Sequence, residues 1–230
     1  MTKKRIATMA TCIALVGAVA VGGTLALLSQ QSNNVINIFT VGAGYDADEI
    51  KLDEDTVHQE VSGTNLGGYK GNGVPVEERV TGNTYSNLVA GTTLDKDPTF
   101  RIVDDEDEMH SPKSWFVAQV TGLDDNAGKL SVSAVEIGNG WYEVSFKDGV
   151  YTYTQVTKAD QIKENTWYIY DTAISAGDET DPLFTQLHVD TVIAGANPAN
   201  IVISGTAVEA VGNATFEASR DAVMAAAGLK

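Results

Sequence analysis

The sequence predicts an all-β protein whose antiparallel strands pack as a sandwich or close into a barrel. Short segments that alternate between apolar and polar residues recur through most of the chain. Turn signals rich in Gly, Asn and Asp separate several of these segments. A parallel sheet would require strands that alternate with helices along the chain, and the sequence does not show that alternation. The chain of 230 residues holds one sizeable domain or two small ones.

The expected strands follow one another from the first third of the chain to its last tenth. Each is short and rich in β-branched or aromatic residues, or alternates in polarity. They are Ile36–Val41, Ile50–Leu52, Trp115–Val120, Lys129–Ile137, Trp141–Phe146, Val150–Val156, Thr166–Tyr170, Gln186–Ile193 and Ile201–Val211.

Turn residues predict how some of these strands are connected. Gly138-Asn139-Gly140 and Lys147-Asp148-Gly149 each lie between alternating segments, which is typical of tight hairpins. The Gly- and Asn-rich stretch from Ser62 to Gly73 predicts a long loop or a hairpin tip. The charged stretch Asp95-Lys96-Asp97 is expected to form a solvated loop before Pro98 at the start of a strand.

Helix is expected mainly at the end of the chain. After Thr215, the apolar residues Phe216, Val223 and Ala227 recur near helical spacing, and Gly228 provides a stop. Residues 158–163 predict at most one further helical turn.

The first 26 residues have the pattern of an export signal, expected to be helical. A basic segment, Lys3–Arg5, precedes the small and apolar run Ile6–Leu25. Thr24 and Ala26 then stand at the −3 and −1 positions of a signal-peptidase site, so the mature chain would begin near Leu27. A run of this length can also span a bilayer as a retained signal anchor.

This division predicts three parts: a signal peptide (1–26), a mature N-terminal segment (27–41) and a single β-sandwich domain (42–230). The lone cysteine, Cys12, lies within the signal. A cleaved chain would therefore have no disulfide, and would depend on its core, a bound ion or neighbouring subunits.

Charge excludes several partners. The net charge of −16 and the isoelectric point near 4.4 argue against nucleic acid and anionic lipid, which both need a basic surface. Contact with a membrane is expected only through an uncleaved signal.

Catalytic motifs are missing from the sequence. It has no HExxH helix, GxSxG elbow, P-loop or GxGxxG turn, and His58, His110 and His188 stand far apart. We therefore expect no enzyme, no catalytic residue and no cofactor.

The acidic run from Asp104 to Glu108 is the one weak metal candidate. Asp104, Asp105 and Asp107 could supply oxygen ligands to Ca²⁺. Consecutive acids on an extended chain point in different directions, however, and the EF-hand spacing is absent. A solvated, self-repelling loop is the alternative that we favour.

An ordered set of segments resembles the TasA/camelysin family of exported Gram-positive proteins, which carry a SipW-type signal peptide. The segments are GGTLALLS in the signal, NIFTVG, IKLDED, YSNLVAGTTLDKDPTFRI at 85–102, SWFVAQVTG at 114–122, SAGDETDPLFTQLHVD at 175–190 and the late GTAVEAVG. The resemblance implies a jelly-roll-like β-sandwich, secretion to the extracellular matrix or cell surface, and processing by a dedicated signal peptidase.

The resemblance also implies a structural subunit of biofilm-matrix fibres, with other copies of itself as partners. The mature N-terminal segment would leave its own subunit and complete the sheet of the next. This segment is uncharged, and its pocket-filling side chains would be Val35, Ile36, Ile38, Phe39 and Val41. Alternatively, Ile36–Val41 pairs within its own sandwich.

Two other functions remain open from the sequence. A surface binding module or adhesin could stack Trp141, Trp167, Tyr168 and Tyr170 on sugars, although these residues alternate as core residues do. A camelysin-like metallopeptidase is the less favoured alternative, since a catalytic zinc needs about three protein ligands.

Overall fold

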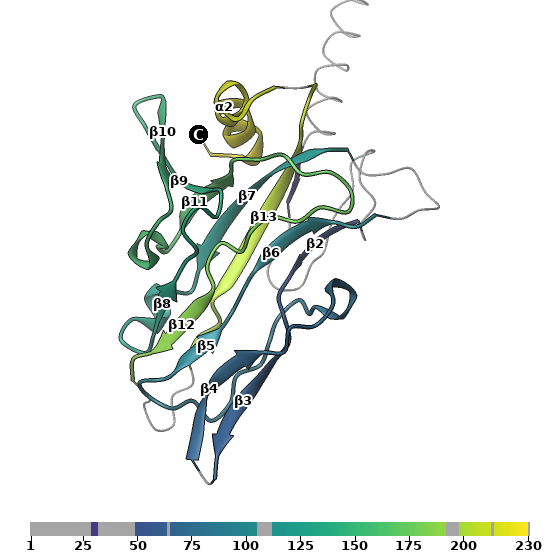
Figure 1. The fold of residues 1–230 in the computed structure, drawn as a ribbon. Helices are drawn as coiled ribbons and strands as arrows, with labels where there is room; N and C mark the ends of the chain where they lie inside the picture. Colours follow the sequence, from purple (N-terminus) through teal and green to yellow (C-terminus); the bar gives the residue numbers. More distant parts are fainter. Residues whose placement is uncertain are drawn as a thin grey trace, which may run out of the picture.

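The computed structural model describes residues 29–31, 49–63, 65–104, 112–191, 198–212 and 214–229, the first of these ranges as backbone only. These residues form an antiparallel β-sandwich with one helix packed on its outer side (Figure 1). The predicted all-β sandwich with a short C-terminal helix is confirmed.

The larger sheet has six antiparallel strands. In spatial order they are β1 (Ser29–Gln31), β13 (Val202–Glu209), β7 (Ser114–Thr121), β11 (Thr166–Tyr170), β9 (Trp141–Lys147) and β10 (Val150–Gln155). The longest pairing joins β13 to β7 over eight residues, from Val202 opposite Thr121 to Glu209 opposite Ser114.

The second layer has five strands, β3 (Val57–Ser62), β4 (Asn65–Gly71), β5 (Thr93–Asp95), β12 (Gln186–Val189) and β8 (Leu130–Ala134). Its strands pair antiparallel except β4 and β5, which run parallel where Tyr69 faces Leu94. A separate antiparallel pair joins β2 (Ile50–Asp53) to β6 (Thr99–Ile102). Three short 3₁₀ turns, η1 (Val76–Glu78), η2 (Asp124–Asn126) and η3 (Ala159–Gln161), complete the connections.

Strand β7 shows how the sandwich is built, because both of its faces are buried. Phe116 and Val120 point into the main core, which contains residues of every sheet. Trp115 and Val117 point to the other face, where α2 (Phe216–Ala227) covers them through residues such as Met224. The six-stranded sheet is therefore the middle layer of the molecule.

Most of the expected elements are confirmed. Strands β2, β7, β8, β9, β10, β11, β12 and β13 and helix α2 lie where the sequence predicts them, within a few residues at their ends. Gly228 ends α2 with a φ of 103°, and residues Asp148 and Gly149 form the β9–β10 turn with positive φ values. The expected strand Ile36–Val41 lies outside the described residues.

One connection prediction is confirmed only in part, and another is wrong. The hairpin tip expected between Ser62 and Gly73 lies at the start of that stretch, where Ser62 of β3 pairs with Asn65 of β4. Most of the remainder is strand β4 and not a loop, because its glycines allow a close approach that a side chain would block. A Cβ on Gly68 would lie 2.1 Å from the carbonyl oxygen of Thr93. The segment Gly138–Gly140 is not a hairpin turn, since it connects β8 of one sheet to β9 of the other.

Candidate functional site

A buried ion pair lies at the C-terminal ends of strands β2 and β5. Glu54 directly follows β2, and Lys96 directly follows β5. Lys96 Nζ lies 2.5 Å from Glu54 Oε2, and the two side chains are only 8% and 3% exposed. We call the set of charged residues around this pair, Asp53, Glu54, Asp55, Arg79, Lys96, Asp97 and Arg101, the charged corner.

Asp53 binds both arginines of the charged corner. Its Oδ1 accepts a hydrogen bond from Arg79 Nε at 3.0 Å, and its Oδ2 accepts one from Arg101 Nε at 2.7 Å. The Asp53 side chain is 4% exposed, so both bonds are shielded from water. One carboxylate thus ties strands β2 and β6 to the loop that carries Arg79.

Asp55 and Asn83 fix that loop, which runs from β4 to β5. The carboxylate of Asp55 accepts hydrogen bonds from the backbone N–H groups of Gly73 at 2.6 Å and Val74 at 3.1 Å. The Asn83 N–H donates to Glu54 Oε1 at 2.7 Å, and its side-chain amide donates to the carbonyl of Asp55. The backbone of Glu54 also exchanges two hydrogen bonds with Val80.

Burial and charge oppose each other in setting the pKa values of Asp97 and Arg79, whereas both raise that of the neighbouring Tyr85. Burial raises the pKa of Asp97 above its ordinary value, despite the Asp55 N–H and the Arg79 guanidinium, which lower it. Burial alone would lower the pKa of Arg79, but the carboxylates of Asp97 and Asp53 outweigh it and raise that pKa. Burial, followed by the charge of Glu54, raises the pKa of Tyr85 well above its usual range.

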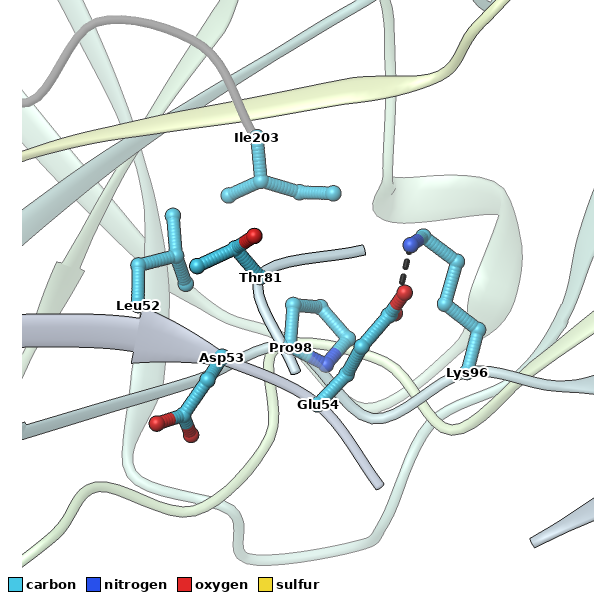
Figure 2. A pocket seen from close by; sticks show the side chains of 7 residues that line it. All are labelled: Leu52, Asp53, Glu54, Thr81, Lys96, Pro98 and Ile203. Atoms are coloured by element: carbon cyan, nitrogen blue, oxygen red, sulfur yellow. Dashed lines mark hydrogen bonds and ion pairs between the residues drawn. The ribbon is translucent and has the colours of Figure 1, made fainter. Parts of the chain in front are cut away.

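A small hollow opens beside the ion pair. Figure 2 shows Lys96 and Glu54 facing each other on one side of it, with Ile203, Leu52, Thr81, Pro98 and Asp53 around the remainder. Its volume of about 10 Å³ is close to the minimum that holds a single water molecule. The hollow is too small for an organic substrate.

The expected solvated loop at Asp95-Lys96-Asp97 is wrong, because these charges find partners far away in the sequence. Lys96 is buried, and Asp95 and Asp97 are half-buried. Glu54 lies 42 residues before Lys96, so local pattern gives no sign of the pairing. The signal that could have indicated it is the acidic triplet directly after a β-prone segment, matched by an isolated lysine before Pro98.

A different site lies at the edge of the six-stranded sheet. Strand β1 pairs antiparallel with β13, with Ser29 opposite Val208 and Gln31 opposite Thr206. All eight residues of β13 pair with β7 on its other side, but only three pair with β1. Among the described residues, the Val202–Gly205 half of this edge has no strand beside it.

Most of the residues singled out in the sequence cannot be placed. The cleavage residues Thr24, Ala26 and Leu27 lie outside the described residues, as do Val35, Ile36, Ile38, Phe39 and Val41. Of the calcium candidates, Asp104 is described and exposed, whereas Asp105 and Asp107 are outside the described ranges. Within those ranges, no group of three or more His, Cys, Asp or Glu side chains could hold a metal ion.

The two described histidines lie apart on the five-stranded layer. His58 is on β3, where its Nδ1 lies 2.6 Å from Asn72 Oδ1, and His188 is on β12. His110 is outside the described residues.

The aromatic residues proposed to stack on sugars serve mainly as core. Trp141, Tyr168 and Tyr170 are buried, and Trp167 is half-buried against the cluster under α2. Trp141 Nε1 donates to the carbonyl of Asp181 at 2.8 Å, so even its polar atom is used internally. These rings offer no continuous platform for a sugar.

No described helix is both long enough and apolar enough to cross a membrane. Comparison of the chain with protein-family models, with curated proteins and with solved structures gave no match.

Proposed function

We propose that this protein is an exported structural subunit that polymerises by donating its N-terminal strand to the next copy. The observation that carries the proposal is the pairing of β1 with β13. An N-terminal strand that completes a sheet edge within one chain can complete the same edge of an identical neighbour, because the backbone partners are the same.

The edge that β1 covers has room for a longer donor. Continuing the antiparallel register of β1 along β13 brings Val35 of a donor opposite Val202 of the acceptor. A donor that extends beyond Gln31 would add backbone hydrogen bonds that the three-residue β1 does not make. The same backbone groups of β13 could accept this longer strand from a neighbouring copy.

The N-terminal signal pattern supports release of this strand. Cleavage before Leu27 would free Ser29–Gln31 from the membrane-directed segment, whereas an uncut chain would hold them next to it. Export, assembly in the extracellular matrix or at the cell surface, and the resemblance to TasA/camelysin proteins form one consistent proposal. It requires a signal peptidase and further copies of the chain as partners.

A pair of cysteines in register tests whether the strand is exchanged. The variant Gln31→Cys with Thr206→Cys places the thiols on directly opposed residues, which is close enough for a disulfide. Strand donation predicts that oxidised assemblies give covalent ladders of multimers on denaturing gels. The matched control, Gln31→Cys with Ser204→Cys, is two residues out of register and should crosslink far less. Monomers with only an internal disulfide, at every protein concentration, would contradict the proposal.

A further inference from the structure

The charged corner brings an amine and a carboxyl group into contact in a buried place. Lys96 Nζ and Glu54 Oε2 are 2.5 Å apart, and neither side chain is more than 8% exposed. Both residues are held through their backbones: Glu54 bonds to Val80 in both directions, and the Lys96 N–H donates to the carbonyl of Thr185. Such fixed proximity is what makes a reaction between two groups effectively intramolecular.

The two oxygens of the Glu54 carboxylate have different partners. Its Oε1 accepts the N–H of Asn83 at 2.7 Å, and its Oε2 faces the amine. A backbone N–H at this position stabilises the negative charge that develops on Oε1 when a nucleophile attacks the carboxyl carbon. The two oxygens therefore have different roles, one to remain and one to leave.

The hollow beside the pair is lined mainly by apolar side chains, with Asp53 also among its lining residues. Leu52, Pro98 and Ile203 line the hollow next to the pair, with the Thr81 side chain between them (Figure 2). A reaction between the two side chains requires the neutral amine and the carboxylic acid, which one proton transfer from Nζ to Oε2 provides. The hollow is near the lower limit of size that holds one water molecule.

We propose that Lys96 and Glu54 form an intramolecular isopeptide bond. One proton passes from Lys96 Nζ to Glu54 Oε2, and the nitrogen lone pair then attacks the carboxyl carbon to form the N–C bond. A second proton passes from Nζ to Oε2, the C–Oε2 bond breaks, and Oε2 leaves as water. The ammonium loses two protons and the leaving oxygen gains two, so the reaction needs no oxidant, reductant or other reactant.

The bond would connect parts of the fold that no continuous sheet connects. Glu54 follows β2 of the two-stranded pair, and Lys96 follows β5 of the five-stranded layer. The described ranges contain no cysteine, since the single one is Cys12. A covalent tie across 42 residues would stabilise the chain as a disulfide does, by restricting its unfolded state. This inference does not depend on strand donation.

Mass spectrometry of the purified full chain tests the bond. After denaturation, the intact mass should be lower by one water, about 18 Da, than the mass of the same chain without the bond. Trypsin should release one branched peptide in which 52–70 is joined to 80–101, with no cleavage after Lys96. This peptide map is independent of where the N-terminus has been cut.

Two variants serve as controls for the map. Lys96→Arg retains the positive charge but removes the amine, and Glu54→Ala removes the carboxyl group. In both, the two peptides should separate and the loss of one water should disappear. If the unmodified chain yields the separate peptides 52–70 and 80–96, the pair is an ordinary ion pair and the proposal is overturned.

Discussion

The apolar core and the charged corner meet on strand β6, and they stabilise the fold in different ways. Phe100 of β6 is 2% exposed and packs between rings, with Phe116 and Trp141 at centroid distances of 5.3 and 5.9 Å. The next residue, Arg101, points to the other face and binds Asp53. The stability that the core contributes depends on how well its side chains fill the available volume. The stability of the charged corner depends on each buried charge having an oppositely charged partner.

The largest expected effect lies in the core. Phe100→Ala should lower the free energy of unfolding by about 3–5 kcal/mol, because a buried ring is replaced by a cavity. Urea denaturation measures the change. The exposed Val150→Ala is the matched truncation on the surface, and it should change stability by less than about 0.5 kcal/mol.

Gly205 provides a second test of packing around Phe100, because a Cβ on Gly205 would lie 2.0 Å from Phe100 Cε1. Gly205→Ala alone should destabilise by about 1–3 kcal/mol through overpacking. Combined with Phe100→Ala, its added cost should shrink, because the ring that it strikes is gone. Strict additivity in the double variant would show that the contact does not determine the effect.

In the charged corner, removal of one charge should destabilise the fold even when the volume of the side chain is unchanged. Asp53→Asn has almost the same size but leaves Arg79 and Arg101 without their shared carboxylate, at a cost of about 3 kcal/mol. The control is Asp148→Asn in the β9–β10 turn, where the φ of 52° suits asparagine. Equal stability of the two variants in urea would contradict the claim that the ion pairs of Asp53 stabilise the fold.

Alkaline pH should act on both regions through tyrosine. Burial raises the pKa of Tyr85, which lies beside the charged corner, and of Tyr168 in the core. Above about pH 10 the unfolded chain loses these protons while the folded chain retains them, so stability falls as pH rises, by at most about 1.4 kcal/mol per pH unit for each tyrosine.

Urea midpoints measured between pH 9 and 11 test this pH dependence. Tyr85→Phe and Tyr168→Phe should each make the decline less steep. A slope that neither substitution alters would contradict the assignment.

The smallest expected loss of stability comes from removing a hydrogen bond to the outer helix, α2. Tyr153 of β10 donates a hydrogen bond to Asp221 of α2 at 2.7 Å, in a partly exposed position. Tyr153→Phe should cost about 0.5–1 kcal/mol in thermal or urea unfolding, as a typical single hydrogen bond does. A loss as large as that of Asp53→Asn would indicate that α2 contributes more to the fold than its packing suggests.

Local sequence pattern predicts the middle layer well. Strand β11 and the turn at Asp148 and Gly149 are confirmed, because alternation and left-handed turn residues are properties of a few neighbouring residues. The same reasoning is wrong for Gly67 and Gly68, which lie in strand β4 and not in a loop: Gly68 approaches Thr93 of β5 closely, and Gly67 lies against Glu60 of β3.

The charged corner could not be predicted in the same way. Lys96 and Glu54 are separated by 42 residues, and Asp53 meets Arg101 only because β2 pairs with β6. A charge in a short loop is usually solvated, and no local pattern distinguishes Asp95-Lys96-Asp97 from that common case. Strand β1 lies within the predicted N-terminal segment 27–41, but local pattern places the strand at Ile36–Val41, because Ser29–Gln31 has no apolar residue that would indicate β-structure.

The most direct test of strand donation is electron microscopy of two purified proteins at matched concentrations. One begins at Leu27, and the other lacks 27–41 and begins at residue 42. The account predicts fibres from the first, and from the second a folded monomer with the same circular dichroism spectrum and no fibres. Fibres of the same form from the shortened protein would contradict the central claim.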